Sequence, residues 1–312
     1  MTLKWIVVLP AAKMLLRAWI SYGKASRRHC ERCGILGAVM RDRIRRDLPV
    51  AAGRAASKVP QITIFFWIVK ILTTAQGEAV SDFLYFRYGA VLAGTLGTAG
   101  LVIALTLQFR ARRYVAWIYW AAVVMVAIFG TMAADGLHVT LGVPYSVSTP
   151  FFAISLAVIF VAWYATEKTL SIHSINTWRR EAFYWATVMA TFALGTALGD
   201  FTATTLGWGY LASGIVFTGV IAIPAIAWRF GMNPILAFWF AYVVTRPLGA
   251  SFADYLGVSH AYGGLGLGRG TVGLALTIVI IGFVGYLAVT RKDVEEGATA
   301  RPPKRAGHRA AR

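Results

Sequence analysis

Long runs of apolar residues alternate with short polar loops along most of the chain. Each run approaches the ~20 residues that a helix needs to cross a hydrocarbon layer of about 30 Å. Only helices and closed barrels cross lipid with every backbone group paired, and apolar runs of this length favour helices. We therefore predict an all-α, polytopic integral membrane protein. Its eight predicted transmembrane helices lie at residues 61–82, 89–108, 114–134, 149–166, 182–200, 206–228, 234–254 and 271–290.

Helix starts and loop charges support this pattern. Asn233 precedes Pro234 and Thr149 precedes Pro150, and a capping residue followed by proline is typical of a helix start. Basic residues gather in the loops on one side of the predicted membrane, whereas the opposite loops hold only Arg87 and Arg269. By the positive-inside rule, both termini are predicted to be cytoplasmic. The basic loop residues are Arg110, Arg112, Arg113, Lys168, Arg179, Arg180 and Arg229.

The composition agrees with a membrane protein. Hydrophobic residues make up 58% and charged residues 14%, with a mean hydropathy of +0.62, whereas soluble domains have about 25% charged residues. Of the net charge of +18, fourteen units lie in the two tails, residues 1–58 and 291–312. The chain has no zinc-finger, helix-turn-helix or RNA-binding signature, so we expect a lipid bilayer and no nucleic acid as partner.

The chain divides into three predicted regions. Residues 1–58 form a basic cytoplasmic extension, read either as an interfacial amphipathic segment or as an over-long gene model whose true start is near Met40. Its Cys30 and Cys33 lack the second ligand pair of a structural zinc site and are read as free thiols. Residues 59–290 form the transmembrane domain, and residues 291–312 form a basic cytoplasmic tail.

An internal repeat organises the transmembrane domain. An aromatic pair ending in tryptophan is followed by glycine ten residues later and by aspartate five residues after that. The spacing predicts four parallel two-helix repeats, at about 59–110, 111–168, 178–230 and 231–290. The four copies are Phe66-Trp67/Gly77/Asp82, Tyr119-Trp120/Gly130/Asp135, Tyr184-Trp185/Gly195/Asp200 and Phe238-Trp239/Gly249/Asp254.

Helical geometry gives this spacing a meaning. At 100° per residue, the positions 3, 7, 11 and 15 after each tryptophan form one stripe about 120° wide that ends in the aspartate. Each repeated glycine has a small residue four positions later, a pattern that allows two membrane helices to approach closely. We therefore predict that the motif helices pack centrally through the glycines, with the other helices outside them.

Five acidic residues belong to these stripes: Glu78, Asp82, Asp135, Asp200 and Asp254. An ionisable group within the hydrocarbon costs at least ~2.5 to 3.5 kcal/mol at mid-helix, so such groups usually face a protein interior or water. One interpretation is a set of carboxylates around a vestibule; the other is that the aspartates only cap helix ends. Lys70 precedes Glu78 by eight residues and Arg246 precedes Asp254 by eight, so both basic residues are predicted counter-ions, or competitors of a transported cation.

The four-fold pattern resembles a family of bacterial membrane proteins of unknown function, built from tandem repeats of two transmembrane segments around a tryptophan. Its most characteristic stretch here is Lys58-Val-Pro-Gln-Ile-Thr, followed by Phe66-Trp67 and by Leu72-Thr-Thr-Ala-Gln-Gly-Glu78. The resemblance covers roughly residues 58–290. It implies a membrane location, which we expect to be the bacterial inner membrane, and implies nothing about activity.

These residues favour secondary transport of a small cation, either proton-coupled or of a divalent metal. Hard oxygen ligands suit Mg²⁺, Mn²⁺ or protons better than soft metals. The alternative is a non-transporting membrane scaffold or sensor whose aspartates cap helices. We expect no enzyme and no cofactor, because the sequence has no nucleophile with a matched base and no phosphate-binding loop. His138 and His260, in loops just beyond two of the aspartates, are candidate supplementary metal ligands.

Overall fold

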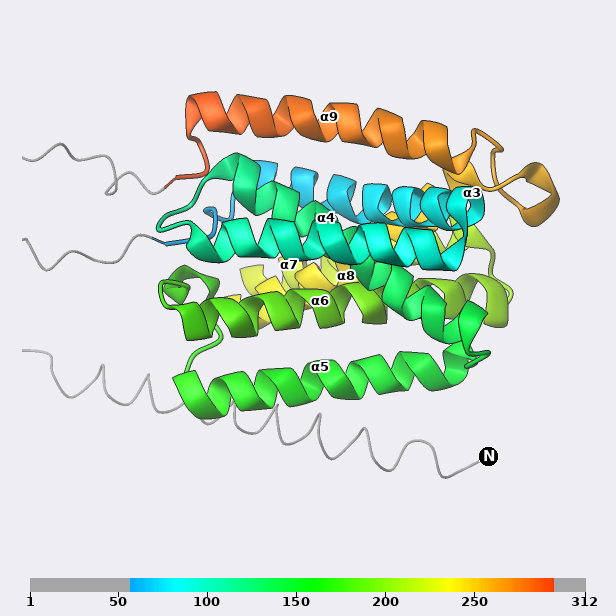
Figure 1. Ribbon diagram of the computed structural model, residues 1–312. Helices are drawn as coiled ribbons and strands as arrows, with labels where there is room; N and C mark the ends of the chain where they lie inside the picture. The colour runs from blue at the N-terminus through cyan, green and yellow to red at the C-terminus, as the bar shows by residue number, and fades with distance from the viewer. Residues whose placement is uncertain (1–56, 295–312) are drawn as a thin grey trace, which may run out of the picture.

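The computed structural model describes residues 57–294, and all its long elements are helices (Figure 1). The N-terminal residues 1–56, with Cys30 and Cys33, and residues 295–312 lie outside the described part. Within residues 57–294, seven helices are long and apolar enough to cross a membrane, as in a multi-pass membrane protein. They are α3 (Ile64–Arg110), α4 (Ala116–Asp135), α5 (Tyr145–Glu167), α6 (Trp178–Asp200), α7 (Tyr210–Arg229), α8 (Pro234–Gly257) and α9 (Arg269–Thr290).

The first two predicted segments are joined within α3, which therefore counts as one helix of 47 residues. Gly89 interrupts it with φ 81° and ψ 164°, a backbone conformation that glycine adopts without steric cost. The chain reverses there, because Lys58 Nζ, before the helix starts, lies 3.1 Å from the carbonyl oxygen of Phe109 near its end. A straight helix of that length would separate these ends by about 70 Å. The sequence predicted a loop at residues 83–88 here, whereas the helix continues through these residues as far as Gly89.

Helix starts follow the sequence in one predicted case and not in the other. Asn233 caps α8, its side chain accepting a hydrogen bond from the backbone of Ile235 with Pro234 at the start, as predicted. The predicted start of α5 at Thr149 is wrong, since α5 begins at Tyr145 and contains Pro150. Thr149 instead donates its hydroxyl to the carbonyl of Ala197 in α6, 3.0 Å away. A tertiary hydrogen bond has replaced the expected cap.

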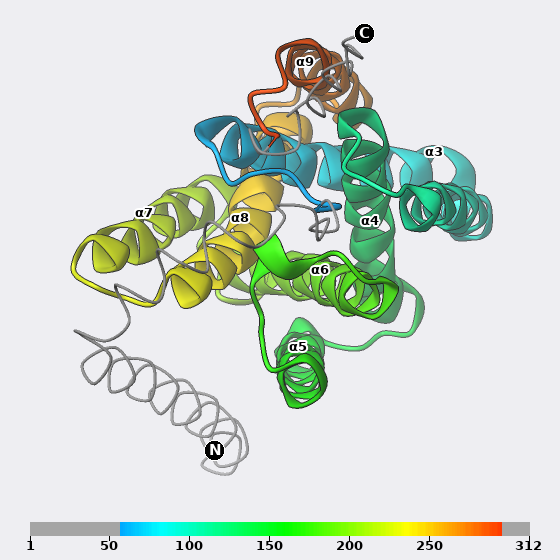
Figure 2. The ribbon, with the colours of Figure 1, turned by 90° about the vertical axis from the view of Figure 1, so that its left-hand side faces the viewer.

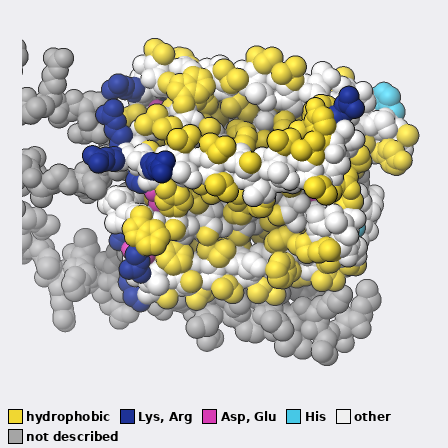
Figure 3. Space-filling view, viewed as in Figure 1, with side chains coloured by type: hydrophobic (Ala, Val, Ile, Leu, Met, Phe, Trp, Pro, Cys, Tyr) yellow, Lys and Arg dark blue, Asp and Glu magenta, His cyan; other side chains and the backbone are white. Residues whose placement is uncertain are grey.

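The helices that carry the motif form an inner ring. The first part of α3, α4, α6 and α8 surround a common centre when the bundle is viewed along its length (Figure 2). Within the ring, α3 packs on α4, α4 on α6, α6 on α8 and α8 on α3. Outside it, α5 packs on α6, α7 on α8 and α9 on α3. The outer helices present apolar side chains to the surroundings, as Figure 3 shows for α5 and α9.

The two ends of the bundle differ in charge. Lysine and arginine side chains gather at the left-hand end in Figure 3, where α3 begins and α9 ends. The described chain starts and finishes at this end, because the backbone of Gln61 donates a 2.9 Å hydrogen bond to the carbonyl of Asp293. At the opposite end lie wide π-helical turns that extend α4 and α6, Gly136–Thr140 and Phe201–Thr205. We refer to these as the basic end and the opposite end.

Candidate functional site

The aromatic pairs of the motif close the ring toward the basic end. The first aromatic side chain of each pair lies against the tryptophan of the next copy, and the fourth returns to the first. Tyr119 and Tyr184 also share a hydrogen bond of 2.5 Å between their hydroxyls. The ring centroids are separated by 5.7 Å for Phe66–Trp120, 5.7 Å for Tyr119–Trp185, 6.2 Å for Tyr184–Trp239 and 5.6 Å for Phe238–Trp67.

The repeated glycines form a second layer with the same cyclic order. Each lies against the residue found seven positions after tryptophan in the next copy: Gly77 against Ala127, Gly130 against Phe192, Gly195 against Arg246 and Gly249 against Thr74. A methyl group at Gly77 or Gly130 would lie only 2.5 or 2.6 Å from a neighbouring Cβ. The glycines therefore allow the close helix approach that their spacing predicted.

Arg246 lies at the centre of the ring and is fully buried. Its guanidinium donates to Glu78 Oε2 at 2.5 Å, to Thr196 Oγ1 at 2.6 Å and to the carbonyl of Thr74 at 2.9 Å, and it also contacts the Thr131 hydroxyl. Glu78, Thr131 and Thr196 occupy the same motif position in three copies. Arg246 from the fourth copy thus joins the other three. It pairs with Glu78 of α3, whereas its spacing in the sequence predicted a pair with Asp254 of its own helix.

Lys70 is also buried in the ring, with 1% of its surface exposed. Its ammonium lies 3.9 Å from the ring centroid of Phe192 and 4.2 Å from that of Tyr242. Within residues 57–294 it has no hydrogen-bond acceptor and no carboxylate partner. The predicted role of Lys70 as a counter-ion is therefore not found. Glu78 pairs with Arg246, and the Lys70 ammonium lies against two aromatic rings instead.

Beyond Arg246 the ring widens into a cavity of about 400 Å³, which we call the carboxylate cavity. All five predicted acidic residues line it, contributed by α3, α4, α6 and α8. Exposed residues such as Phe86 and Thr204 also line it, so the cavity reaches the surface near the opposite end. The five acids are Glu78, Asp82, Asp135, Asp200 and Asp254.

The interpretation that the aspartates only cap helix ends is not supported by their contacts. Asp135 and Asp200 have helical backbone angles and make no capping hydrogen bond with their side chains. Asp82 lies inside α3, and α8 continues past Asp254 to Gly257. The four aspartates therefore line the cavity, and no capping role is seen for their side chains: Asp135 and Asp200 are the last residues of α4 and α6, but the chain continues there into π-helical turns.

Two arginines neutralise part of this negative charge. Arg246 pairs with Glu78 as described, and Arg269 pairs with Asp82 through a 2.6 Å contact between Nε and Oδ2. Asp135, Asp200 and Asp254 have no ion pair among the described residues. One carboxylate oxygen from each of Glu78, Asp82 and Asp135 lies within 4.8 Å of the other two, a spacing that suits a cation.

Several residues of the cavity were not recognised in the sequence. Arg269 was assigned to an external loop, yet it is the first residue of α9 and lines the cavity. Tyr145 and Tyr210 line the cavity as well, each as the first residue of its helix. None belongs to the repeated motif, so its spacing could not identify them. His138 stacks on Tyr145 with ring centroids 3.8 Å apart, and neither it nor His260 lines the cavity.

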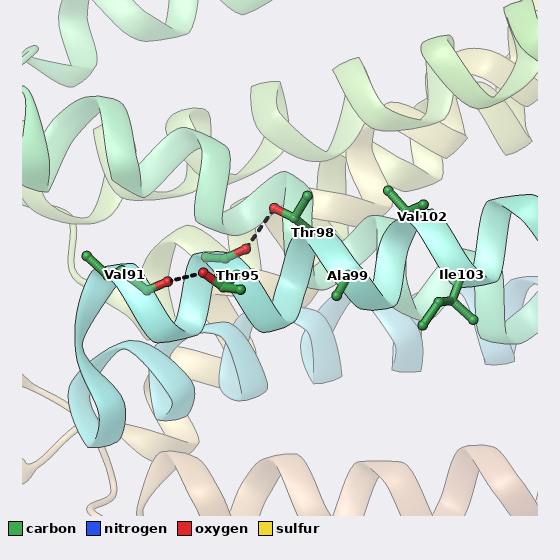
Figure 4. Close-up of a pocket in the computed structure, with 7 residues that line it drawn as sticks. Val91, Thr95, Thr98, Ala99, Val102 and Ile103 are labelled. Atoms are coloured by element: carbon green, nitrogen blue, oxygen red, sulfur yellow. Dashed lines mark hydrogen bonds between the residues drawn. The ribbon is translucent and has the colours of Figure 1, made fainter.

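A second hollow lies on the outer surface of α3 and has a different character. Val91, Thr95, Thr98, Ala99, Val102 and Ile103 line it (Figure 4). The hydroxyls of Thr95 and Thr98 donate to the carbonyls of Val91 and Gly94, at 2.8 and 2.7 Å. Because its polar atoms are already satisfied and it carries no charge, this surface is no candidate for binding a cation.

The basic end holds a buried polar cluster that the sequence did not predict. Glu181, which lies just before the predicted span 182–200, is fully buried and pairs with Lys58 Nζ at 2.6 Å. Gln108 donates to its other oxygen at 2.9 Å. Lys58 is the first residue of the characteristic stretch Lys58-Val-Pro-Gln-Ile-Thr, and this was the one feature of the sequence that could have pointed to the cluster. The cluster ties the segment before α3 to the end of α3 and to α6.

Asp293 and Tyr114 form a further contact at the basic end, outside the membrane-spanning helices: Tyr114 precedes α4 and Asp293 follows α9. Asp293 is 2% exposed and accepts a hydrogen bond from the Tyr114 hydroxyl. Burial raises the pKa of Asp293 above its ordinary value, and the hydrogen bond from Tyr114 opposes that shift. Burial and the contact with Asp293 likewise raise the pKa of Tyr114.

This contact predicts a pH effect on stability. Since the folded state holds the Asp293 proton more tightly than the unfolded state, the free energy of unfolding falls as pH rises from about 4 through the raised pKa. Asp293→Asn should remove that component, giving a smaller fall in melting temperature between pH 4 and 8. Equal slopes for the parent and the variant would contradict it.

Four stretches of the chain match one family of repeats. Residues 65–114, 118–169, 183–231 and 237–293 each match the family described as Repeat of Unknown Function (DUF347). Each matched stretch contains one copy of the aromatic, glycine and aspartate motif. No curated protein and no solved structure matches the chain. With four tandem matches over most of its length, the chain belongs to this repeat family.

Proposed function

We propose that the protein is a secondary membrane transporter that binds a small cation in the carboxylate cavity. One observation carries the proposal: every repeat contributes a carboxylate to a single cavity that reaches one end of the bundle, while packed aromatic rings close the other end. Among the described residues, five carboxylates face two guanidinium groups there. A cation entering the cavity would find carboxylate oxygens without ion pairs, on Asp135, Asp200 and Asp254.

The proposed arrangement is eight spans in four parallel two-helix repeats. The reversal at Gly89 supports it by dividing α3 into two spans, and the cyclic contacts of the aromatic pairs and glycines support a common direction for the motif helices. The basic end is proposed to face the cytoplasm of a bacterial inner membrane, because lysine and arginine are concentrated there. The carboxylate cavity then opens outward.

Arg246 is the proposed barrier between the cavity and the aromatic layer. Its guanidinium crosses the ring and pairs with Glu78. A cation bound close to Glu78 would compete with Arg246 for the carboxylate. Release of Arg246 would break the ion pair that joins α8 to α3. A ligand shifts a conformational equilibrium only by binding its two states differently, and this competition supplies such a difference.

Reconstitution into liposomes tests the proposal. The parent should move a member of a cation panel containing Mn²⁺, Mg²⁺, protons and small organic amines. Asp135→Asn and Asp200→Asn should each lower the rate about tenfold or more, as expected when a charged ligand is lost. Glu167→Gln, a carboxylate paired with Arg180 outside the cavity, is the matched control and should transport normally.

Two results would count against transport. If folded aspartate variants moved cations as fast as the parent, the carboxylate pathway would be wrong. If no cation crossed, and none raised the melting temperature of the parent, a non-transporting scaffold or sensor would be the better assignment.

A further inference from the structure

The carboxylate cavity contains buried polar groups with no protein partner. Asp254 is 7% exposed, yet its carboxylate accepts no hydrogen bond from any residue between 57 and 294. Ser81, 2% exposed, lines the same cavity with a hydroxyl that is likewise unbonded within the described chain. Both side chains line the cavity without a protein partner, so their oxygens are available to a ligand that carries hydrogen-bond donors.

The geometry fits a bare metal ion poorly. The one described group whose oxygens converge consists of Glu78, Asp82 and Asp135, and arginines hold the first two. Mg²⁺ needs oxygens at about 2.0–2.1 Å in an octahedron, so both guanidiniums would have to leave. Asp200 and Asp254, which have no ion pair, are not part of that group. The free carboxylates are instead distributed around a space of about 400 Å³, and pockets of about 300–1,000 Å³ hold organic ligands.

Arg269 shows which chemistry the cavity accepts. Its guanidinium meets Asp82 at 2.6 Å and lies 4.4 Å from the ring centroid of Phe86. A carboxylate together with an aromatic face is a general arrangement for binding a delocalised or substituted cation. The cavity wall contains three more aromatic side chains beside the free carboxylates: Tyr85, Tyr145 and Tyr210.

We propose that the cavity binds a small organic cation bearing a guanidinium or primary ammonium group, and that Arg269 is a tethered competitor for part of its site. This inference rests on the proposed cation-binding function and specifies its substrate class. Asp254 and Ser81 accept hydrogen bonds from the cationic head, while the tyrosines and Phe86 cover its apolar part. The side chain of Arg269 is 30% exposed, so it can leave Asp82 for water when the ligand enters.

Calorimetric binding to the full-length protein in lipid nanodiscs tests this, with agmatine, putrescine and Mn²⁺ as separate probes. Agmatine carries both a guanidinium and an ammonium group and should bind to the parent. Asp254→Asn should weaken its binding about tenfold or more, since a charged hydrogen bond is lost. Arg269→Gln should strengthen it about three- to tenfold by removing the competitor. Misfolding cannot produce such a gain.

Further variants separate the outcomes. Phe86→Leu, at an exposed position, should weaken agmatine binding about threefold without weakening that of Mn²⁺. Glu167→Gln is the matched control outside the cavity. If only Mn²⁺ bound, in a manner dependent on Asp254, the organic substrate class would be wrong while cation binding remained. If agmatine bound the Asp254→Asn variant as tightly as the parent, this inference would fail. Binding and transport of none of the probes would reject both proposals.

Discussion

Replacing Arg246 with glutamine is expected to lower the free energy of unfolding by about 3–5 kcal/mol, the usual cost of removing one partner from a buried ion pair. The guanidinium is fully buried and serves acceptors on three other helices of the ring. Its removal leaves the Glu78 carboxylate buried without a cation. Unfolding in mixed detergent micelles, followed by tryptophan fluorescence, measures the change.

A double-mutant cycle isolates the pair from the rest of the network. Glu78→Gln combined with Arg246→Gln should recover part of the loss, because the unpaired buried charge is no longer present. Arg229→Gln, at the exposed end of α7, is the matched control and should change stability by less than about 0.5 kcal/mol. Strict additivity of the two single substitutions would show that Arg246 and Glu78 do not interact as described.

Replacing Gly195 with alanine should be the second most damaging change, costing about 1–3 kcal/mol, as overpacking of a filled interior does. The added methyl group would lie 2.5 Å from Arg246 Cβ and 3.0 Å from Pro247 Cδ. Both atoms are close to the backbone of α8, so a side-chain rotation cannot relieve the overlap. The helices must separate, which also disturbs the guanidinium of Arg246.

Two other glycines provide the comparison for Gly195. Gly282 in α9 has no atom within 4 Å of an added methyl group, so Gly282→Ala should leave stability unchanged or raise it, since alanine favours helices by about 1 kcal/mol. Gly249→Ala, which would place its methyl 2.8 Å from Thr74 Cβ, should resemble Gly195→Ala. Equal melting temperatures for Gly195→Ala and Gly282→Ala would refute the close approach of α6 and α8.

Much of the candidate site could be found in the sequence, because its residues recur with the repeat. The spacing from tryptophan to glycine to aspartate is set along one helix, and helical geometry converts it into one face. The five acids therefore emerged as a set before any contact was known. The partners of those acids did not, since the same spacing assigned Lys70 to Glu78 and Arg246 to Asp254. In the structure Arg246 takes Glu78, while Lys70 rests on Phe192 and Tyr242.

By itself, the sequence determined the all-α class, the apolar helices, the four-fold motif and the uneven charge of the two ends. These properties depend on local composition and on spacing within single helices, so they need no knowledge of neighbours. Only the tertiary structure decided the burial of Glu181, the entry of Arg269 into the cavity and the pairing of Arg246. Each depends on which helix lies opposite, and packing between segments far apart in the chain sets that choice.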